Sequence, residues 1–480
     1  MGQKQQAHTI KNNKTKIKSF NAEVIDDPND GQKVFVNVSI EPDKVESRKP
    51  LVLIAMIDVS GSMRTSSSKD MKGGEKVGIS RLGLVKHALK TVVSIMSKED
   101  KMSLITFSNE AKICLEATDV NDIGKKLIID KINEMVPYGS TNIWDALRLG
   151  MIKAKKYKDY NTCLMLFTDG EPNINPPMGI IPTLKETISG IKNINFTIST
   201  FAFGYNFDSK LMEGISQIGN GIYGYCPDCT MVGTIFTNFM ANILTTIEST
   251  VRINVKNKYL QKKYEIGGLY SGISRHLGFS LNKSHYKETE IILFLGQEEV
   301  DKIKFIEIRE PNLYILNQYY RNKLIDLIKN NLDNSDNLDY IKISTEIKNL
   351  YDEINKIPEK TEFMKNILID LIDKDPNHGQ VEKAFSQEFF EKWGLNYLLS
   401  FLRFHFVEQC GNFKDQSLKN YENKDFEELS KIGNKIFVNL PPPENDCGGT
   451  KIDSANFQNI FYNAYGGCFS GNAIVELKNG

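Results

Sequence analysis

The chain has 480 residues, in which 60 Lys and Arg balance 60 Asp and Glu. Its length predicts about three domains, and the balanced charge argues against nucleic acid as a partner because there is no overall basic field. Hydrophobic residues make up 40% of the chain, which is ordinary for a globular protein with more than one core.

The N-terminal residues 1–19 are polar and basic, and we expect a disordered tail. They lack the apolar core of a signal peptide, and no stretch of the chain approaches the ~20 apolar residues of a membrane span. Seven scattered cysteines, an odd number, favour reduced thiols over a disulfide framework. The expected location is therefore cytoplasmic. Residues 20–49 follow as an N-terminal strand segment, with apolar alternation over 33–40.

Residues 50–248 carry alternating strand and helix patterns. The apolar runs at 51–57, 102–107, 163–168 and 197–203 predict buried strands, and helical patterns fall near 80–97, 121–132, 143–157, 183–191, 208–217 and 232–248. Such alternation predicts an α/β fold with a doubly wound, mostly parallel sheet. Residues 113–116 fit a short antiparallel edge strand.

Polar oxygen ligands follow the first of these strands. Asp58, Ser60 and Ser62 stand at alternate positions after the apolar run 51–57, and hard oxygen ligands suit a hard divalent cation. Thr141 precedes a helical pattern, and Asp169 follows a second buried strand. Ligands bind outside the carboxyl ends of strands in open α/β sheets, so these segments predict one metal site. The alternative is that they serve only as helix caps and turn formers.

Residues 50–248 resemble a von Willebrand factor type A domain. Asp58, Ser60 and Ser62 match the first loop of its metal-ion-dependent adhesion site, Thr141 the second and Asp169 the third, and all of them keep the usual residue type. The resemblance implies Mg²⁺ or Mn²⁺ at this site. It also implies an open coordination position for an Asp or Glu of a partner protein.

Two further modules follow. Period-2 segments at 251–255, 291–295 and 302–308 predict a β-rich module over 249–310, which we expect the strand at 35–40 to join. Helical spacings then run through 311–443, with a polar loop at 331–339. The Trp-Gly-x-x-Tyr-Leu element from Trp393 and the Asn-Phe-Lys-Asp element from Asn412 resemble the helical module found between a von Willebrand A domain and an intein-like domain.

Other polar groups carry weaker signals. The pair His405 and Cys410 has the wrong spacing for one helical face, so a structural role is favoured over a metal pair or a thiol–imidazole dyad. One Cys-x-x-Cys, Cys226 to Cys229, cannot close a zinc site by itself, and a turn is favoured over a redox pair. The polar loop 64–78 is expected to be a solvated insertion and not a gate over the metal.

Residues 444–480 begin with a polar linker, and the Cys-Phe-x-Gly-x-x-x-Val element from Cys468 resembles the opening of a hedgehog/intein (Hint) domain. Cys468 lies where such domains carry the thiol that attacks the preceding carbonyl, here that of Gly467. The Thr-x-x-His block and the His-Asn end of that family are absent from the sequence, so we expect a truncated Hint domain. Its remainder is expected to be lost by truncation, interrupted in the gene or supplied in trans. We therefore expect no self-processing at the Gly467–Cys468 bond.

These observations favour a non-enzymatic, Mg²⁺-dependent protein-binding protein. The alternative is a precursor or remnant of an autoprocessing protein in which Cys468 is the nucleophile. A third hypothesis is a structural scaffold whose metal site is unused. The sequence does not indicate the oligomeric state.

Overall fold

The structure is a computed structural model that describes residues 17–44, 48–66, 79–191, 196–227, 229–303, 310–372, 380–412, 414–441 and Asp446. The chain divides into two compact units. We call the unit of Met1–Arg48, Thr245–Gln409 and Lys414–Asn423 the accessory unit, and the unit of Lys49–Leu244, Cys410–Phe413 and Lys424–Gly480 the sheet unit. Most of the predicted tail, most of the loop 64–78 and the expected Hint opening around Cys468 lie outside the described residues.

The sheet unit is built on a six-stranded sheet of order β5-β4-β3-β6-β7-β8. Neighbouring strands run parallel except for β4 and β5, which are antiparallel. This is the predicted doubly wound fold with its antiparallel edge strand. The strands are β3 (Leu51–Asp58), β4 (Lys101–Phe107), β5 (Ala111–Asp119), β6 (Asn161–Thr168), β7 (Phe196–Phe203) and β8 (Asn220–Cys226).

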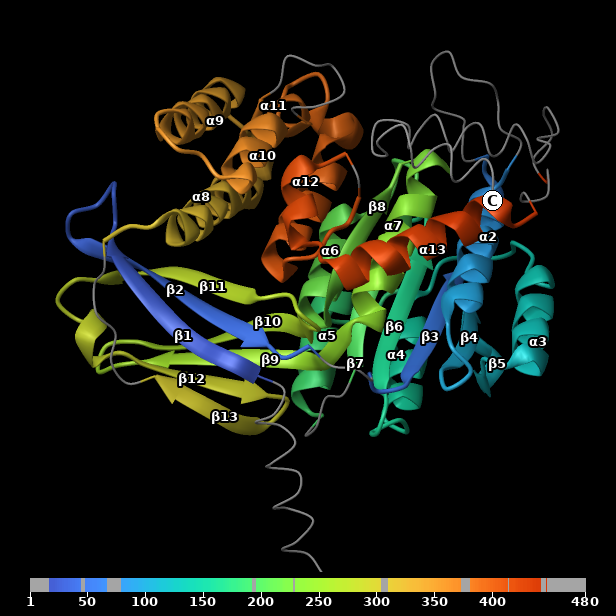
Figure 1. The fold of residues 1–480 in the computed structure, drawn as a ribbon. Helices are drawn as coiled ribbons and strands as arrows, with labels where there is room; N and C mark the ends of the chain where they lie inside the picture. The colour runs from blue at the N-terminus through green and yellow to red at the C-terminus, as the bar shows by residue number, and fades with distance from the viewer. Residues whose placement is uncertain are drawn as a thin grey trace, which may run out of the picture. The chain divides into compact units, whose positions relative to one another are not determined.

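Helices cover both faces of this sheet (Figure 1). They are the short 3-10 helix η1 (Gly61–Arg64), then α2 (Arg81–Ile95), α3 (Asp122–Asn133), α4 (Ile143–Ala154), α5 (Ile180–Ser189), α6 (Ser209–Ile218), α7 (Cys229–Leu244) and α13 (Lys424–Asn439). Helix α4 lies close to the sheet because Gly150 faces it: a Cβ there would lie 2.6 Å from the Met56 sulfur.

The order of the strands creates a topological switch point between β3 and β6. The chain runs from β3 outward through β4 and β5, then returns across to β6 on the other side of β3. Strands β3 and β6 pair in parallel, with Ile57 opposite Phe167, so their carboxyl ends lie side by side. Both strands are buried along their whole length, as expected for parallel strands covered by helices.

Helix α13 packs in the sheet unit, against α2 and α7. A Cβ on Gly433 of α13 would lie 2.5 Å from the Thr237 Cγ2 atom of α7. The His87 Nε2 atom of α2 lies 3.2 Å from the Phe437 carbonyl oxygen. The sequence analysis placed this helix in one module over 311–443, whereas its contacts separate it from the helices before it.

The accessory unit contains two antiparallel sheets. One has the order β1-β2-β11, with β1 (Ile17–Asp26), β2 (Lys33–Pro42) and β11 (Arg275–Asn282). The other has the order β10-β9-β12-β13, with β10 (Gln261–Tyr270), β9 (Thr246–Lys256), β12 (Glu290–Leu295) and β13 (Glu298–Ile303). Apolar side chains of both sheets share one core, including Val36, Val38, Val251, Ile253 and Leu293. The expected joining of the early strand is confirmed, because β2 pairs with β11.

Several predictions of the sequence analysis need correction here. Strand β1 begins at Ile17, inside the segment expected to be a disordered tail. Strands β8, β10 and β11 were not predicted, since glycines or exposed polar residues interrupt their apolar patterns. The helix predicted over 232–248 ends at Leu244, because β9 begins at Thr246.

One short 3-10 helix of the accessory unit, η2 (Tyr286–Glu288), lies between β11 and β12. The other helices of this unit follow β13: α8 (Leu313–Asp333), η3 (Ser335–Asn337), α9 (Tyr340–Asn355), α10 (Glu362–Leu371), α11 (Gln380–Ala384), the π-helix η4 (Phe390–Gly394), α12 (Leu395–Val407) and the 3-10 helix η5 (Gln416–Tyr421). Over the described ranges, none of the protein's helices combines the length and apolar character needed to cross a membrane.

Candidate metal centre

Two predicted ligands lie at the switch point of the sheet. Asp58 is the last residue of β3, and Asp169 directly follows β6. They are 0% and 2% exposed, respectively. The parallel pairing of β3 and β6 therefore places both carboxylates at the edge of the sheet where ligands bind in open α/β folds.

The two serines link these carboxylates. The backbone N–H of Ser60 donates to Asp58 Oδ1 at 2.7 Å, and the Ser60 and Ser62 hydroxyl oxygens are 3.0 Å apart. The Ser62 hydroxyl then donates to Asp169 Oδ1 at 2.7 Å. The short turn of η1 thus directs both hydroxyls from the end of β3 toward the end of β6.

Thr141 completes the group from the loop before α4. Its backbone N–H donates to Asn173 Oδ1 at 2.7 Å. A Cβ built on Gly170 would lie 3.6 Å from the Ser62 hydroxyl oxygen and 3.7 Å from that of Thr141. Both hydroxyls therefore lie over the same glycine, and the structure brings all five predicted residues together.

The environment of Asp58 is unusual for a carboxylate. Burial, with a smaller contribution from the charge of Asp169, raises the pKa of Asp58 to about 6, although hydrogen bonds from Thr168 and Ser60 oppose the shift. The Thr168 hydroxyl donates to Asp58 Oδ2 at 2.6 Å. Asp58 is thus held by neutral donors, and a nearby cation would favour its charged form.

Asp169 has a charged partner that the sequence analysis missed. Arg81, the first residue of α2, donates from Nη1 to Asp169 Oδ2 at 2.7 Å. The sequence feature that could have indicated this partner is a basic residue directly after a helix cap. The cap is Ser80, whose hydroxyl accepts from the Gly83 N–H at 2.9 Å. The same Ser80 hydroxyl donates to Asp446 Oδ2 at 2.5 Å, so a residue near the C-terminal end of the described chain lies next to Arg81.

The donors at this edge of the sheet fit a hard divalent cation. All are oxygens, and neutral hydroxyls outnumber the two carboxylates, which suits Mg²⁺ because it keeps few direct carboxylates. Within the described ranges, no three His, Cys, Asp or Glu side chains gather in a group that could hold a metal. A cation here would therefore depend on the hydroxyls of Ser60, Ser62 and Thr141.

A hollow of about 400 Å³ lies beside the loop that carries Asp169. Its lining is mainly apolar, with carboxylates contributed by two side chains; the lining residues include Glu171, Pro172, Ile180, Pro182, Asp208 and Leu211. Asn173 of the same loop accepts from Thr141. The surface next to the candidate metal centre is therefore recessed and could receive side chains of a bound molecule.

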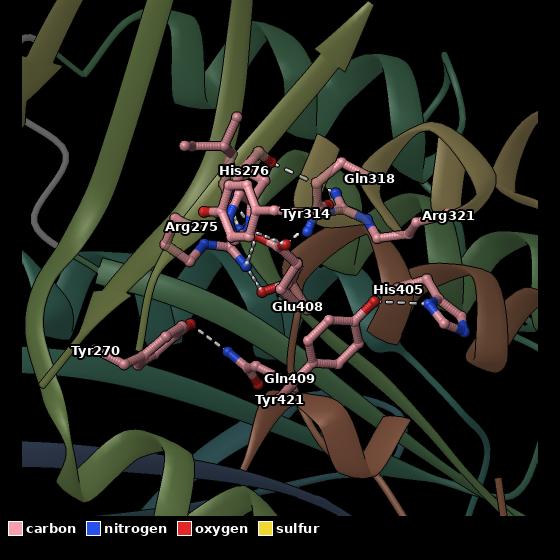
Figure 2. Close-up of polar contacts among 12 residues, drawn as sticks. Tyr270, Arg275, His276, Tyr314, Gln318, Arg321, His405, Glu408, Gln409 and Tyr421 are labelled. Atoms are coloured by element: carbon pink, nitrogen blue, oxygen red, sulfur yellow. Dashed lines mark hydrogen bonds and ion pairs between the residues drawn. The ribbon is translucent and has the colours of Figure 1, made fainter. Parts of the chain in front are cut away.

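A second polar cluster lies inside the accessory unit (Figure 2). Glu408 pairs with Arg321 and, at 3.2 Å, with Arg275, and its Oε1 atom lies 2.8 Å from His276 Nδ1. Burial alone would raise the pKa of Glu408, but Arg321, His276 and Arg275 together lower it to about 2. The carboxylate and both guanidinium groups are almost fully buried, so we assign this cluster a structural role.

His405 and Cys410, considered from the sequence as a pair, have different hydrogen-bond partners. His405 contacts the Tyr421 hydroxyl at 2.8 Å and the Ser417 hydroxyl at 3.0 Å. Cys410 instead accepts from Asn238 Nδ2 at 3.6 Å, and both of these residues belong to the sheet unit. Cys226 is buried at the end of β8, and the side chain of Cys229, the other cysteine of the motif, lies outside the described residues.

The two sequence elements of the helical module meet through one hydrogen bond. The Tyr397 hydroxyl donates to Asp415 Oδ1 at 2.8 Å. Nearby, Asp370 accepts the backbone N–H groups of Gln416 and Ser417 at 2.9 and 2.8 Å. Burial and the charge of Asp415 raise the pKa of Asp370. These contacts fasten η5 to α10 and α12.

Comparison with known families agrees with these features. Residues 53–171 match the model of the von Willebrand factor type A domain. Residues 347–434 match a second model, described as VWA / Hh protein intein-like. The chain therefore contains a von Willebrand factor type A domain region, followed by a segment that matches the intein-like model.

Relatives among known proteins cover parts of the chain. The Escherichia coli protein YfbK is 26% identical over 241 residues, 48% of this chain and 39% of its own length. The Synechocystis protein sll0103 is 28% identical over 199 residues, 41% of this chain and 43% of its own length. The chain thus spans about two fifths of the length of these relatives.

Solved structures share the fold. A von Willebrand factor type A protein from Catenulispora acidiphila aligns with a TM-score of 0.57 at 12% identity, covering 75% of this chain and 92% of its own. The ArnB paralog VWA2 from Sulfolobus acidocaldarius aligns with a TM-score of 0.52 at 12% identity, covering 82% and 99%. Identities this low support the fold alone.

Proposed function

We propose that this protein recognises a protein partner through a divalent cation held at the candidate metal centre. The observation that carries the proposal is the convergence of five oxygen-bearing residues at the switch point of the sheet: Asp58, Ser60, Ser62, Thr141 and Asp169. Mg²⁺ is the proposed cation, and Mn²⁺ would substitute for it, because both prefer oxygen ligands.

The five residues would contribute two kinds of ligand to such a site, neutral hydroxyls and charged carboxylates. Ser60, Ser62 and Thr141 would supply neutral oxygens, and Asp58 and Asp169 would supply negative charge. When bound, the cation offers an electrophilic position to an Asp or Glu of the partner. The hollow beside the Asp169 loop would receive neighbouring side chains of that partner.

We propose a binding role without catalysis. The polar residues at the sheet edge are hydroxyls and carboxylates that hold one another, and the proposed site needs no general base or nucleophile to bind a partner. The odd number and the scattered positions of the seven cysteines support a reducing, intracellular location. Affinity capture from cell extract with Mg²⁺ or with EDTA tests the binding role, and a partner retained equally well in EDTA would contradict metal dependence.

The metal itself is tested by thermal unfolding of the full chain. We expect Mg²⁺ to raise the melting temperature over that in EDTA, because a ligand at one hundred times its dissociation constant stabilises the folded state by about 2.7 kcal/mol. Asp58→Ala should remove the rise. Asp159→Ala, at an exposed position, is the matched control and should keep it. Identical melting curves in Mg²⁺ and EDTA for the unaltered chain would refute the proposal.

A further inference from the structure

Arg81 places a permanent positive charge at the edge of the candidate metal centre. Its Nη1 atom donates to Asp169 Oδ2 at 2.7 Å, and the two side chains are 11% and 0% exposed. The other oxygen of Asp169 accepts from the Ser62 hydroxyl. One carboxylate oxygen thus faces the predicted ligands, and the other is bound to a guanidinium group shielded from water.

The backbone around Arg81 holds this guanidinium in place. The residue begins α2, directly after the helix cap Ser80. Gly204, at the end of β7, has a φ of +84°, and a Cβ there would lie only 2.7 Å from Arg81 Nη2. A side chain at position 204 would therefore displace the guanidinium, so the glycine provides space that the ion pair requires.

Of the two carboxylates, Asp58 and Asp169, Arg81 pairs with Asp169. Asp58 accepts from the Thr168 hydroxyl and the Ser60 backbone N–H, which are both neutral. Asp169 has Arg81. Two buried carboxylates would otherwise repel each other and attract any available cation strongly. The ion pair therefore removes part of the negative charge that a metal ion would encounter.

We propose that Arg81 sets the cation affinity of this site by acting as its built-in counter-charge. This inference rests on the proposed function. With Arg81 beside Asp169, a divalent cation alone binds more weakly than two carboxylates would allow. The loaded site then keeps a net positive charge, which favours an anionic group from the partner. Arg81 is a tuning residue for the metal and contributes no ligand of its own.

The test is a calorimetric titration of the full, metal-stripped chain with Mn²⁺. Arg81→Gln removes the charge but keeps hydrogen-bond donors, and we expect its Mn²⁺ dissociation constant to fall about tenfold, since a buried like charge close to the ion is lost. Arg81→Lys retains the charge and should stay within about threefold of the unaltered chain. Arg64→Gln is the matched control, because Arg64 is exposed and solvent screens its charge.

A second variant protects the test against misfolding. Gly204→Ala keeps Arg81 in the chain but takes away its space, so it should also tighten Mn²⁺ binding. Circular dichroism in EDTA verifies that each variant is folded. Equal or weaker Mn²⁺ binding in folded Arg81→Gln and Gly204→Ala would overturn the role of Arg81 while leaving the metal site intact. Mn²⁺ binding by neither the unaltered chain nor the variants would overturn both proposals.

Discussion

Two buried carboxylates of this protein, Asp169 and Glu408, lie in ion pairs with arginines. Arg81 pairs with Asp169 Oδ2 at the edge of the candidate metal centre. The other carboxylate oxygen of Asp169, Oδ1, faces the predicted ligands and accepts from the Ser62 hydroxyl. Glu408 is surrounded by Arg275, Arg321 and His276. A buried carboxylate that loses its charge leaves its cationic partners unpaired in a medium of low dielectric constant.

Glu408→Gln should therefore destabilise the accessory unit strongly. The substitution keeps the size of the side chain but leaves Arg275 and Arg321 without their buried counter-charge. We expect a loss of about 3–5 kcal/mol in the free energy of unfolding, measured by urea denaturation.

Glu41→Gln is the control for this substitution, because it breaks the exposed Lys18–Glu41 pair on the same unit. It should change the urea midpoint very little, since exposed ion pairs contribute little to stability. Midpoints that fall equally in the two variants would contradict the structural role of the Glu408 cluster.

Helix α13 shows how one element joins a core that its sequence neighbours do not share. It lies more than a hundred residues beyond the strands of the sheet, yet it packs on α2 and α7. Gly433 permits the close approach, since a Cβ there would lie 2.5 Å from Thr237 Cγ2 and 3.0 Å from Ile95 Cδ1. Helices that pack at such a small separation tolerate little added volume.

Gly433→Val should push α13 away from α7. We expect a loss of about 1–3 kcal/mol in the free energy of unfolding, because overpacking forces helices and side chains to shift. Ile432→Ser is the matched control, since Ile432 precedes Gly433 and is 53% exposed; it should stay within about 0.5 kcal/mol of the unaltered chain. Thermal and urea unfolding measure both, and a neutral Gly433→Val variant would argue against this packing.

The stability of the whole molecule should respond to acid through its buried histidines. Burial lowers the pKa of His87 to about 4 and that of His405 to about 3. In the unfolded chain a histidine has a pKa near 6.5. Between these values the unfolded state binds a proton that the folded state does not, so each histidine makes the free energy of unfolding fall as the pH drops below about 6.5. The raised pKa of Asp370 acts in the opposite direction.

His87→Gln isolates one of these contributions. Glutamine cannot titrate but keeps an N–H donor for the Phe437 carbonyl oxygen. From pH 7 to pH 5 we expect the unaltered chain to lose about 2 kcal/mol more of its free energy of unfolding than the variant does. Urea denaturation at both pH values measures the difference. His285→Gln, at a part-exposed position with no buried ring, is the control and should follow the unaltered chain; parallel pH profiles for all three proteins would contradict the prediction.

Local patterns in the sequence were enough to predict five of the six strands of the central sheet and to propose the candidate ligands. The apolar runs before Asp58 and Asp169 are continuous, because parallel strands covered on both faces need apolar residues at every position. Strand β8 was missed because Gly221 and Gly224 interrupt its pattern. A Cβ at Gly224 would lie 2.8 Å from the Phe201 ring, so close packing and not strand preference selects the glycine.

By itself, the sequence determined most strands of the central sheet, which strand ends carry oxygen ligands and which family those ligands resemble, because each depends on residues close together in the chain. Only the tertiary structure decided that Arg81 neutralises Asp169, that Asp446 contacts Ser80 and that α13 joins the sheet unit. These contacts join residues 88, 366 or more than a hundred positions apart. Periodicity and spacing carry no information about such pairs, since they depend on how strands and helices are ordered in space. The motif that begins at Asp58 is therefore visible in the local sequence, whereas the net charge of the candidate metal centre also depends on Arg81, which the motif does not include.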